Sequence, residues 1–189
     1  KVPAYLLPLN TQIVLAMTAG ALFISFAGFY LLEHAHTMKD FSLGEQYLAA
    51  FFQAVTLRTA GFSTVSFASL TNATLLLMIF VMFVGGASGS TAGGVKLNTV
   101  AVVVAFFRSF LHNDRTVVIK KMSIPDEQVK KAFLIFGFGL SIICAAVFVL
   151  TITEALPFLP LVFETVSAFA TVGLSTGITA SFSIAGKLI

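Results

Sequence analysis

Long apolar runs alternate with short polar segments along most of the chain. Residues 13–32 and 132–153 are each largely apolar, and about 20 such residues are enough for a helix to cross a bilayer once. A third apolar tract, residues 73–107, would be about 50 Å long as one helix at about 1.5 Å per residue. Because a hydrocarbon core is only about 30 Å thick, this tract is too long for one uninterrupted membrane helix.

The third tract is interrupted by the small-residue run GGASGSTAGG. Glycine is a poor helix former, and serine and threonine hydroxyls compete for backbone hydrogen bonds. We therefore expect a broken helix with a loop at membrane depth, made of Gly85, Gly86, Ala87, Ser88, Gly89, Ser90, Thr91, Ala92, Gly93 and Gly94. A small-residue face for helix packing is the alternative. A phosphate-binding loop is disfavoured, because Val95 separates Gly94 from Lys96.

Two further apolar segments, residues 46–57 and 161–169, are too short to span a membrane, and each leads into a turn that contains glycine, at 58–64 and 170–176. The two copies correspond, because residues 52–56 parallel 163–167 and residues 59–64 parallel 171–176. Each copy is a spanning helix, a short half-helix, a glycine turn and the beginning of a second spanning helix, in the same direction. Such a parallel repeat differs from the inverted repeats of many secondary transporters.

The composition agrees with a membrane environment. The chain is 58% hydrophobic and only 10% charged, whereas an average soluble domain is about a quarter charged. Its basic residues gather in residues 108–131, which contain Arg108, Arg115, Lys120, Lys121, Lys130 and Lys131. The positive-inside rule places this linker in the cytoplasm and both glycine turns on the outer side of a cell membrane that the chain crosses several times. With charge so localised, no nucleic-acid partner is expected.

The half-helices suggest how a cation is bound. A short helix that enters the membrane from outside directs its carbonyl end, with about half a negative charge, at the membrane centre. This favours a cation there, and the residues after the helix can turn carbonyl oxygens toward it. The candidate carbonyls belong to Thr59, Ala60, Gly61 and Phe62 in the first turn and to Thr171, Val172, Gly173 and Leu174 in the second. Two re-entrant turns that serve only packing are the alternative.

Two charged residues lie beside these turns. Arg58 is the first residue of the first turn, just before its predicted carbonyls, and Glu164 lies in the second half-helix. A charge at membrane depth needs a partner, so both are candidates for supporting the turns, Arg58 by hydrogen bonds to carbonyls or by repelling cations. The alternatives are snorkelling of Arg58 to the outer surface and solvation of Glu164 in an outer vestibule.

Other reactive residue types offer little chemistry. His34, His36 and His112 fall in loops with no metal-binding context, so no transition metal is expected. Cys144 lies in an apolar run, where a lone thiol is most often a small buried hydrophobe. Because there is no nucleophile–base pair and no acidic cluster in the membrane, we expect neither an enzyme nor a bound cofactor.

The segments FFQAVTLRTAGFST, FVGGASGSTAGGVKLNT and FETVSAFATVGLSTG together resemble the Trk/Ktr/HKT superfamily of potassium transporters, most of all its bacterial Ktr- and Trk-type membrane subunits. The resemblance implies an all-α membrane protein with four parallel helix–pore loop–helix repeats around one pore. Residues 1–107 would be the third repeat, 108–131 the cytoplasmic linker, and 132–189 part of the fourth repeat with a truncated inner helix. Gly61 and Gly173 would be filter glycines, and residues 85–94 the gating loop.

The resemblance also implies a function for the longer protein of which this chain would be a piece. That function is K⁺ uptake across the cell membrane, with Na⁺ as the alternative ion and a Na⁺- or H⁺-coupled secondary transporter as the alternative mechanism. The implied partners are the lipid bilayer, a second copy in a homodimer, and a cytoplasmic ring of nucleotide-binding regulatory subunits.

Overall fold

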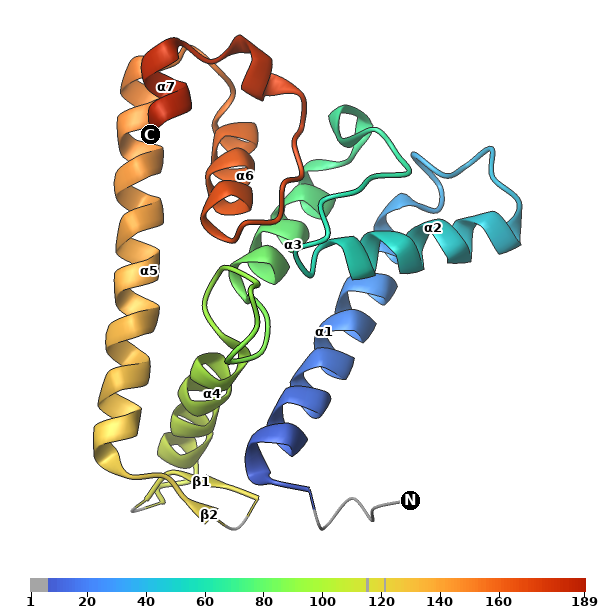
Figure 1. The fold of residues 1–189 in the computed structure, drawn as a ribbon. Coiled ribbons are helices and arrows are strands. Elements are labelled where there is room, and N and C mark those ends of the chain that lie inside the picture. Colours follow the sequence, from blue (N-terminus) through green and yellow to red (C-terminus); the bar gives the residue numbers. More distant parts are fainter. Residues whose placement is uncertain (1–6, 115, 121) are drawn as a thin grey trace.

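The computed structural model describes residues 7–114, 116–120 and 122–189, and it is built mainly of helices (Figure 1). The helices are α1 (Leu9–Glu33), α2 (Leu43–Thr56), α3 (Asn72–Phe83), α4 (Leu97–Leu111), α5 (Asp126–Thr153), α6 (Phe158–Phe169) and α7 (Ile184–Leu188), with two short 3-10 helices, η2 (Phe67–Ser69) and η3 (Ile178–Ser181). A small hairpin pairs β1 (Val118–Ile119) with β2 (Met122–Ser123) in antiparallel register. The predicted all-α class is thus confirmed apart from this hairpin, which the sequence did not suggest.

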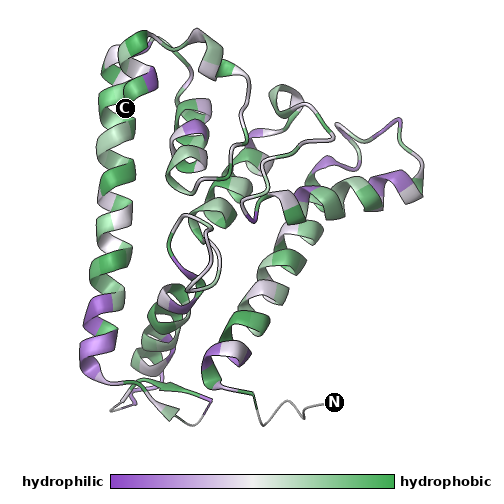
Figure 2. Cartoon of the chain, in the orientation of Figure 1, coloured by the Kyte–Doolittle hydropathy of each residue, from purple (hydrophilic) through white to green (hydrophobic). Residues whose placement is uncertain are grey.

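Helices α1 and α5 are long and apolar enough to cross a membrane, with mean hydropathies of 1.9 and 2.7 in their most apolar windows. Only 11% and 17% of the residues in those windows are buried, unlike the core helices of a soluble protein. Figure 2 shows hydrophobic residues along most of both helices and hydrophilic ones at the lower end of α5.

The helices extend further than the hydrophobic runs that predicted them. Helix α5 begins at Asp126, directly after Pro125, and has two acidic residues in its first turn. Negative charges at this end stabilise a helix, because they interact favourably with its dipole. Helix α4 continues to Leu111. The charged linker expected at 108–131 is therefore helical at both ends, and residues 112–125 connect α4 to α5. Arg115 and Lys121 of that linker lie outside the described residues.

Helices α3 and α4 follow one another nearly end to end, with a looped segment between them (Figure 1). We call this segment, residues 84–96, the connecting loop. Helix α3 packs against α1 and α6, whereas α4 packs against α1 and α5. Both parts of the broken helix pack against α1 of the first sequence copy and against one helix of the second copy, α6 or α5. The connecting loop therefore lies where the two copies meet.

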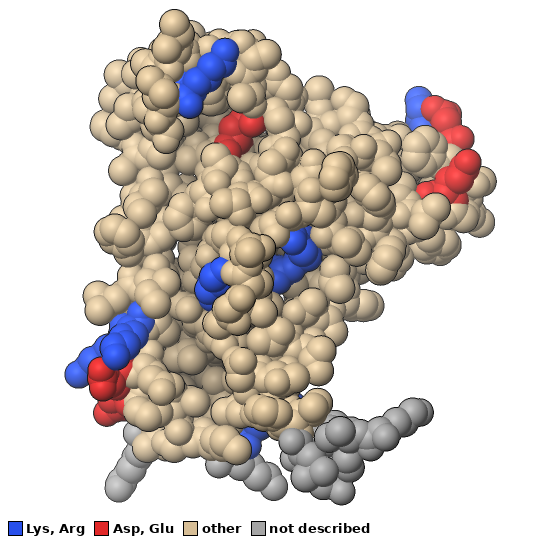
Figure 3. All heavy atoms as spheres, viewed as in Figure 1, with Lys and Arg blue, Asp and Glu red and all other residues tan. Residues whose placement is uncertain are grey.

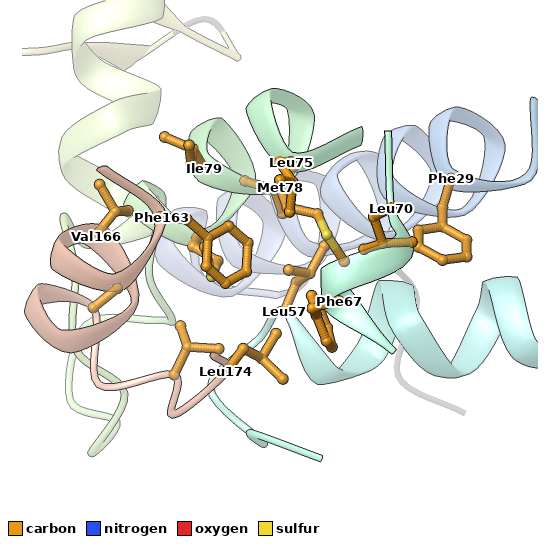
Figure 4. Packing of buried hydrophobic residues seen from close by; sticks show 14 of the residues in the cluster. Phe29, Leu57, Phe67, Leu70, Leu75, Met78, Ile79, Phe163, Val166 and Leu174 are labelled. Atoms are coloured by element: carbon orange, nitrogen blue, oxygen red, sulfur yellow. The ribbon is translucent and has the colours of Figure 1, made fainter. Parts of the chain in front are cut away.

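The main hydrophobic core joins α1, α3 and α6 (Figure 4). Phe29 of α1, Met78 of α3 and Phe163 of α6 are each at most 1% exposed. Leu57, which precedes the first glycine-containing turn (58–64), and Leu174, which lies within the second (170–176), belong to the same cluster. The core therefore anchors both turns. Cys144, by contrast, is exposed on α5, so the expectation of a buried thiol was wrong.

Glu33 at the end of α1 is fully buried and holds the beginning of α3. Its carboxylate accepts hydrogen bonds from Thr71 N (2.9 Å), Thr71 Oγ1 (2.8 Å), Thr74 Oγ1 (2.5 Å) and Thr37 Oγ1 (2.6 Å). Thr71 is the N-cap of α3, where a negative charge stabilises the helix. Glu154 repeats the arrangement at α7, accepting from Ser183 N (3.1 Å) and Ser183 Oγ (2.5 Å).

Candidate functional site

The two short helices α2 and α6 each lead into a turn with the same backbone pattern. We call residues 58–64 the first glycine turn and residues 170–176 the second glycine turn. The φ angles are 68° at Thr59 and 76° at Gly61, and 54° at Thr171 and 84° at Gly173. A threonine at positive φ is uncommon and strained, and such strain gathers at functional sites. The shared pattern makes the two turns structural equivalents.

The turns approach each other at their glycines. A Cβ atom on Gly61 would overlap the carbonyl oxygen of Val172, and one on Gly173 would lie 3.8 Å from the Cα of Gly61. Both glycines also have the positive φ that side chains disfavour. The first glycine turn therefore faces the second, and Gly61 cannot be replaced without moving one of them.

Of the eight predicted filter carbonyls in the two turns, six accept no hydrogen bond from the described residues. Within residues 7–114, 116–120 and 122–189, no N–H or hydroxyl donates a hydrogen bond to the carbonyls of Thr59, Ala60, Gly61, Thr171, Val172 or Gly173. The other two predicted carbonyls differ. Phe62 O accepts from Thr56 Oγ1 (2.5 Å) and Leu174 O accepts from Ser167 Oγ (2.7 Å), so each is tied back to its own half-helix.

A second pair of equivalent residues braces the turns from behind. Gln53 of α2 donates to Thr64 Oγ1 over 3.3 Å, and Glu164 of α6 accepts from Thr176 N (2.7 Å) and Thr176 Oγ1 (3.0 Å). Both side chains are buried. The correspondence of residues 52–56 with 163–167 already paired Gln53 with Glu164, but only the structure gives their partners.

Glu164 makes more contacts than Gln53. Its carboxylate also accepts from Ser175 Oγ (2.8 Å) and Thr179 Oγ1 (2.7 Å), so it is hydrogen-bonded to the polypeptide and not only solvated in a vestibule. Gln53 Oε1, in contrast, has no partner within the described residues. The second glycine turn is thus held by a carboxylate and the first by an amide.

Arg58 reaches the connecting loop instead of the carbonyls of its own turn. Its two terminal nitrogens donate to Val84 O and Gly85 O, each over 2.7 Å. The side chain is partly buried, and no carboxylate of the described residues pairs with it. Arg58 thus donates to carbonyls, as one of the two expectations had it, but these carbonyls belong to the connecting loop where α3 ends and not to its own turn.

The connecting loop is closed at its base. Gly85 N donates to Val95 O (2.9 Å), Val95 N to Phe83 O (3.0 Å) and Leu97 N to Gly86 O (3.0 Å), which pairs the two legs as a short parallel bridge. These bonds satisfy backbone groups that the break in residues 73–107 leaves outside a helix.

The loop also touches the second glycine turn and its own lysine. Gly93 N donates to Thr171 Oγ1 over 3.0 Å. Lys96, at the N-cap of α4, donates from Nζ to Ser90 O (3.2 Å) and to Ala92 O. The predicted gating residues 85–94 are therefore adjacent to the predicted filter residues.

Metal-ligand chemistry is not indicated in the part of the chain that the structure describes, which contains no group of three or more metal-binding side chains. His34, His36 and His112 are all exposed. On the face shown in Figure 3, acidic and basic residues lie in small groups at the lower left, upper right and upper left, and basic side chains lie near the middle.

Residues 4–189 match the family model of TrkH, described as a cation transport protein. The chain belongs to the TrkH family. The predicted family and the expectation that the chain is not an enzyme are therefore confirmed, since this is a family of membrane transport proteins.

Similar curated proteins are named for ion uptake. Ktr system potassium uptake protein B of Vibrio alginolyticus is 40% identical over 187 residues, which cover 98% of this chain and 41% of that protein. Potassium/sodium uptake protein NtpJ of Enterococcus hirae is 32% identical over 186 residues, covering 96% of this chain and 41% of that protein. The chain thus spans about two fifths of these relatives.

A solved structure shares the fold. The potassium transporter TrkH from Vibrio parahaemolyticus superposes with a TM-score of 0.68 at 21% sequence identity, covering 87% of this chain and 35% of that chain. The helical architecture in Figure 1 is therefore that of a known membrane transporter.

Proposed function

We propose that this chain supplies two of the pore-lining turns of a transporter that takes up K⁺ across the cell membrane. The observation that carries the proposal is the set of six unused carbonyl oxygens in two facing, equivalent turns. Carbonyl oxygens can replace the hydration shell of K⁺. The names of the relatives support the choice of ion.

The surroundings of the turns suit a cation. Helices α2 and α6 end at Thr56 and Phe169, directly before the turns, so their partially negative carbonyl ends lie beside the proposed path. The carboxylate of Glu164 adds negative charge behind the second turn. The hydroxyls of Thr56 and Ser167 hold the backbone beyond each filter glycine, which keeps the unused carbonyls in place.

The chain organisation follows the family resemblance. We assign residues 1–107 to a third-type repeat and 132–189 to part of a fourth, with filter segments 58–64 and 170–176. The membrane is crossed several times, and the linker 108–131 lies in the cytoplasm. A homodimer of the longer protein and a cytoplasmic nucleotide-binding regulatory ring complete the proposed assembly.

We assign gating to residues 85–94 of the connecting loop. The hydrogen bond from Gly93 N to Thr171 Oγ1 supports this assignment, because it joins this polar segment to the second glycine turn. Loop movement would then admit or obstruct ions that have passed the filter.

A Na⁺- or H⁺-coupled secondary transporter is the second candidate. The relative named for potassium and sodium uptake favours keeping Na⁺ as the alternative ion. The parallel orientation of the two copies disfavours a coupled mechanism of the inverted-repeat type.

Replacing Gly173 by Asp in the full-length protein tests the filter assignment. Gly173 has φ 84° and faces Gly61, so the substitution should abolish K⁺ uptake in a host that lacks its own uptake systems. Gly177→Asp is the matched control, because Gly177 has φ 95° but no atom within 4 Å of an added Cβ. If the K⁺ uptake of Gly173→Asp equals that of Gly177→Asp, the filter assignment is contradicted.

A further inference from the structure

Side chains from both glycine turns contact the connecting loop, one on each leg. Arg58 stands immediately before Thr59, whose structural equivalent in the second turn is Thr171. Arg58 contacts the N-terminal leg at Val84 and Gly85, and Thr171 contacts the C-terminal leg at Gly93. The loop is thus attached to both turns.

The Arg58 contact replaces bonds that a continuous helix would make. In an α-helix the carbonyls of Val84 and Gly85 would accept from the N–H groups four residues later. Here α3 ends at Phe83, and the guanidinium fork of Arg58 donates to both carbonyls instead. A positive charge is also favourable at the carbonyl end of a helix. Arg58 therefore stabilises the break that forms the loop.

The Thr171 contact depends on a close backbone approach. A Cβ atom on Gly93 would lie 2.6 Å from Ala170 O and 2.7 Å from Thr171 Oγ1. Only glycine lets this leg of the loop lie against the second glycine turn, so that Gly93 N can donate to the threonine hydroxyl.

The tip of the loop lacks such anchors. Ser88, Gly89, Ser90 and Thr91 are exposed. The hydrogen bonds of the tip stay within the loop or come from Lys96 at its end, as in Ser90 Oγ to Ala87 O (2.7 Å) and Lys96 Nζ to Ser90 O (3.2 Å). The turns hold the legs, whereas, among the described residues, the hydrogen bonds of the tip are made only within the connecting loop.

We propose that Arg58 and Thr171 are positioning residues that dock the connecting loop against the two turns and hold it in its flux-limiting position. The part of this proposal that concerns ion flux rests on the proposed function. Its structural part, the docking of the loop, is independent of which ion passes.

Loop docking can be measured by cysteine labelling of the full-length protein. In a cysteine-free version that carries Cys144→Ala, Ser90→Cys serves as an exposed reporter at the loop tip, labelled with a water-soluble maleimide. Arg58→Gln removes the fork and the charge, and Thr171→Val removes the hydroxyl acceptor. We expect labelling to accelerate roughly tenfold in Arg58→Gln and about threefold in Thr171→Val. The effect of Arg58→Gln is larger because hydrogen bonds from a charged group are stronger than a hydrogen bond between neutral groups.

Two matched controls separate docking from general effects. Arg108→Gln removes one positive charge from an exposed site in the last turn of α4, and Thr171→Ser keeps the hydroxyl. Both should label within about twofold of the parent protein. Labelling at the parent rate in both Arg58→Gln and Thr171→Val would overturn the proposal.

Flux in reconstituted vesicles tests the transport consequence. Arg58→Gln should raise K⁺ flux in the intact protein. It should leave the flux unchanged when residues 87–92 are deleted, because the leg that Arg58 holds at Val84 and Gly85 then carries no tip that could limit the flux. A further change of flux in the deletion background would overturn the assignment, since Arg58 would act directly on the pore. If the parent protein carries no K⁺ flux, the proposed function fails, while the labelling rates still decide the docking.

Discussion

Replacing Glu164 by Ala removes the brace of the second glycine turn. Two of its four hydrogen-bond donors belong to Thr176, which is only 8% exposed, so water cannot readily replace the lost carboxylate there. The other two, from Ser175 and Thr179, are on exposed residues, where water can substitute. A hydrogen bond to a charged group contributes about 1.5–3 kcal/mol, so losing the two bonds to Thr176 should destabilise the braced conformation by about 3–6 kcal/mol.

Such a loss is large for transport. Each 1.4 kcal/mol is about tenfold in an equilibrium, so Glu164→Ala should lower K⁺ uptake by more than about 100-fold. Glu164→Gln keeps an acceptor oxygen for Thr176 and can offer its amide to Thr179 Oγ1. Because Glu164→Gln removes mainly the negative charge, the K⁺ uptake of this variant should stay within about tenfold of the parent protein's uptake.

Two assays on the full-length protein follow this effect. One is K⁺ uptake in reconstituted vesicles, and the other is backbone hydrogen exchange in residues 170–180, which should become faster only in Glu164→Ala. Glu127→Ala is the control, because Glu127 makes an exposed salt bridge to Lys131 and such pairs contribute little. Parent-level uptake and exchange in Glu164→Ala would refute the bracing role.

Further predictions concern the helix start and the connecting loop. Glu33→Ala should destabilise the protein by about 3–5 kcal/mol, because it leaves the buried hydroxyl of Thr74 and the half-buried donors of Thr71 without their acceptor. Glu33→Gln should cost less, and equal thermal stability of Glu33→Ala and parent would contradict the capping role. Deleting residues 87–92 should raise K⁺ flux if the loop obstructs the pore, whereas unchanged flux would favour a helix-packing function for the small residues.

The hydrophobic pattern and the internal repeat predicted much of the fold. Apolar runs located α1, α5 and the two half-helices, because burial in lipid selects apolar residues regardless of tertiary partners. The repeat located both glycine turns. Helix ends were predicted less well, since the charged residues after Pro125 sit at the polar end of α5 without interrupting its backbone hydrogen bonds.

Contacts between distant residues could not be predicted in the same way. Glu33 belongs to a polar segment in the sequence, and its burial depends on Thr71 and Thr74 of another helix. The charge of Arg58 at membrane depth predicted that the side chain has a partner. The local sequence pattern did not identify Val84 and Gly85 as that partner. A signal for the helix caps did exist, because Thr71 and Ser183 are related by the same shift as the two turns.

The central claim is that carbonyls of the two glycine turns bind the transported ion. The most direct test is the K⁺ flux of the purified full-length protein in vesicles, compared with its Na⁺ flux and with the flux of Gly61→Asp. We predict a saturable K⁺ flux that exceeds the Na⁺ flux and is lost in the variant. A K⁺ flux that is unchanged by Gly61→Asp would contradict the account.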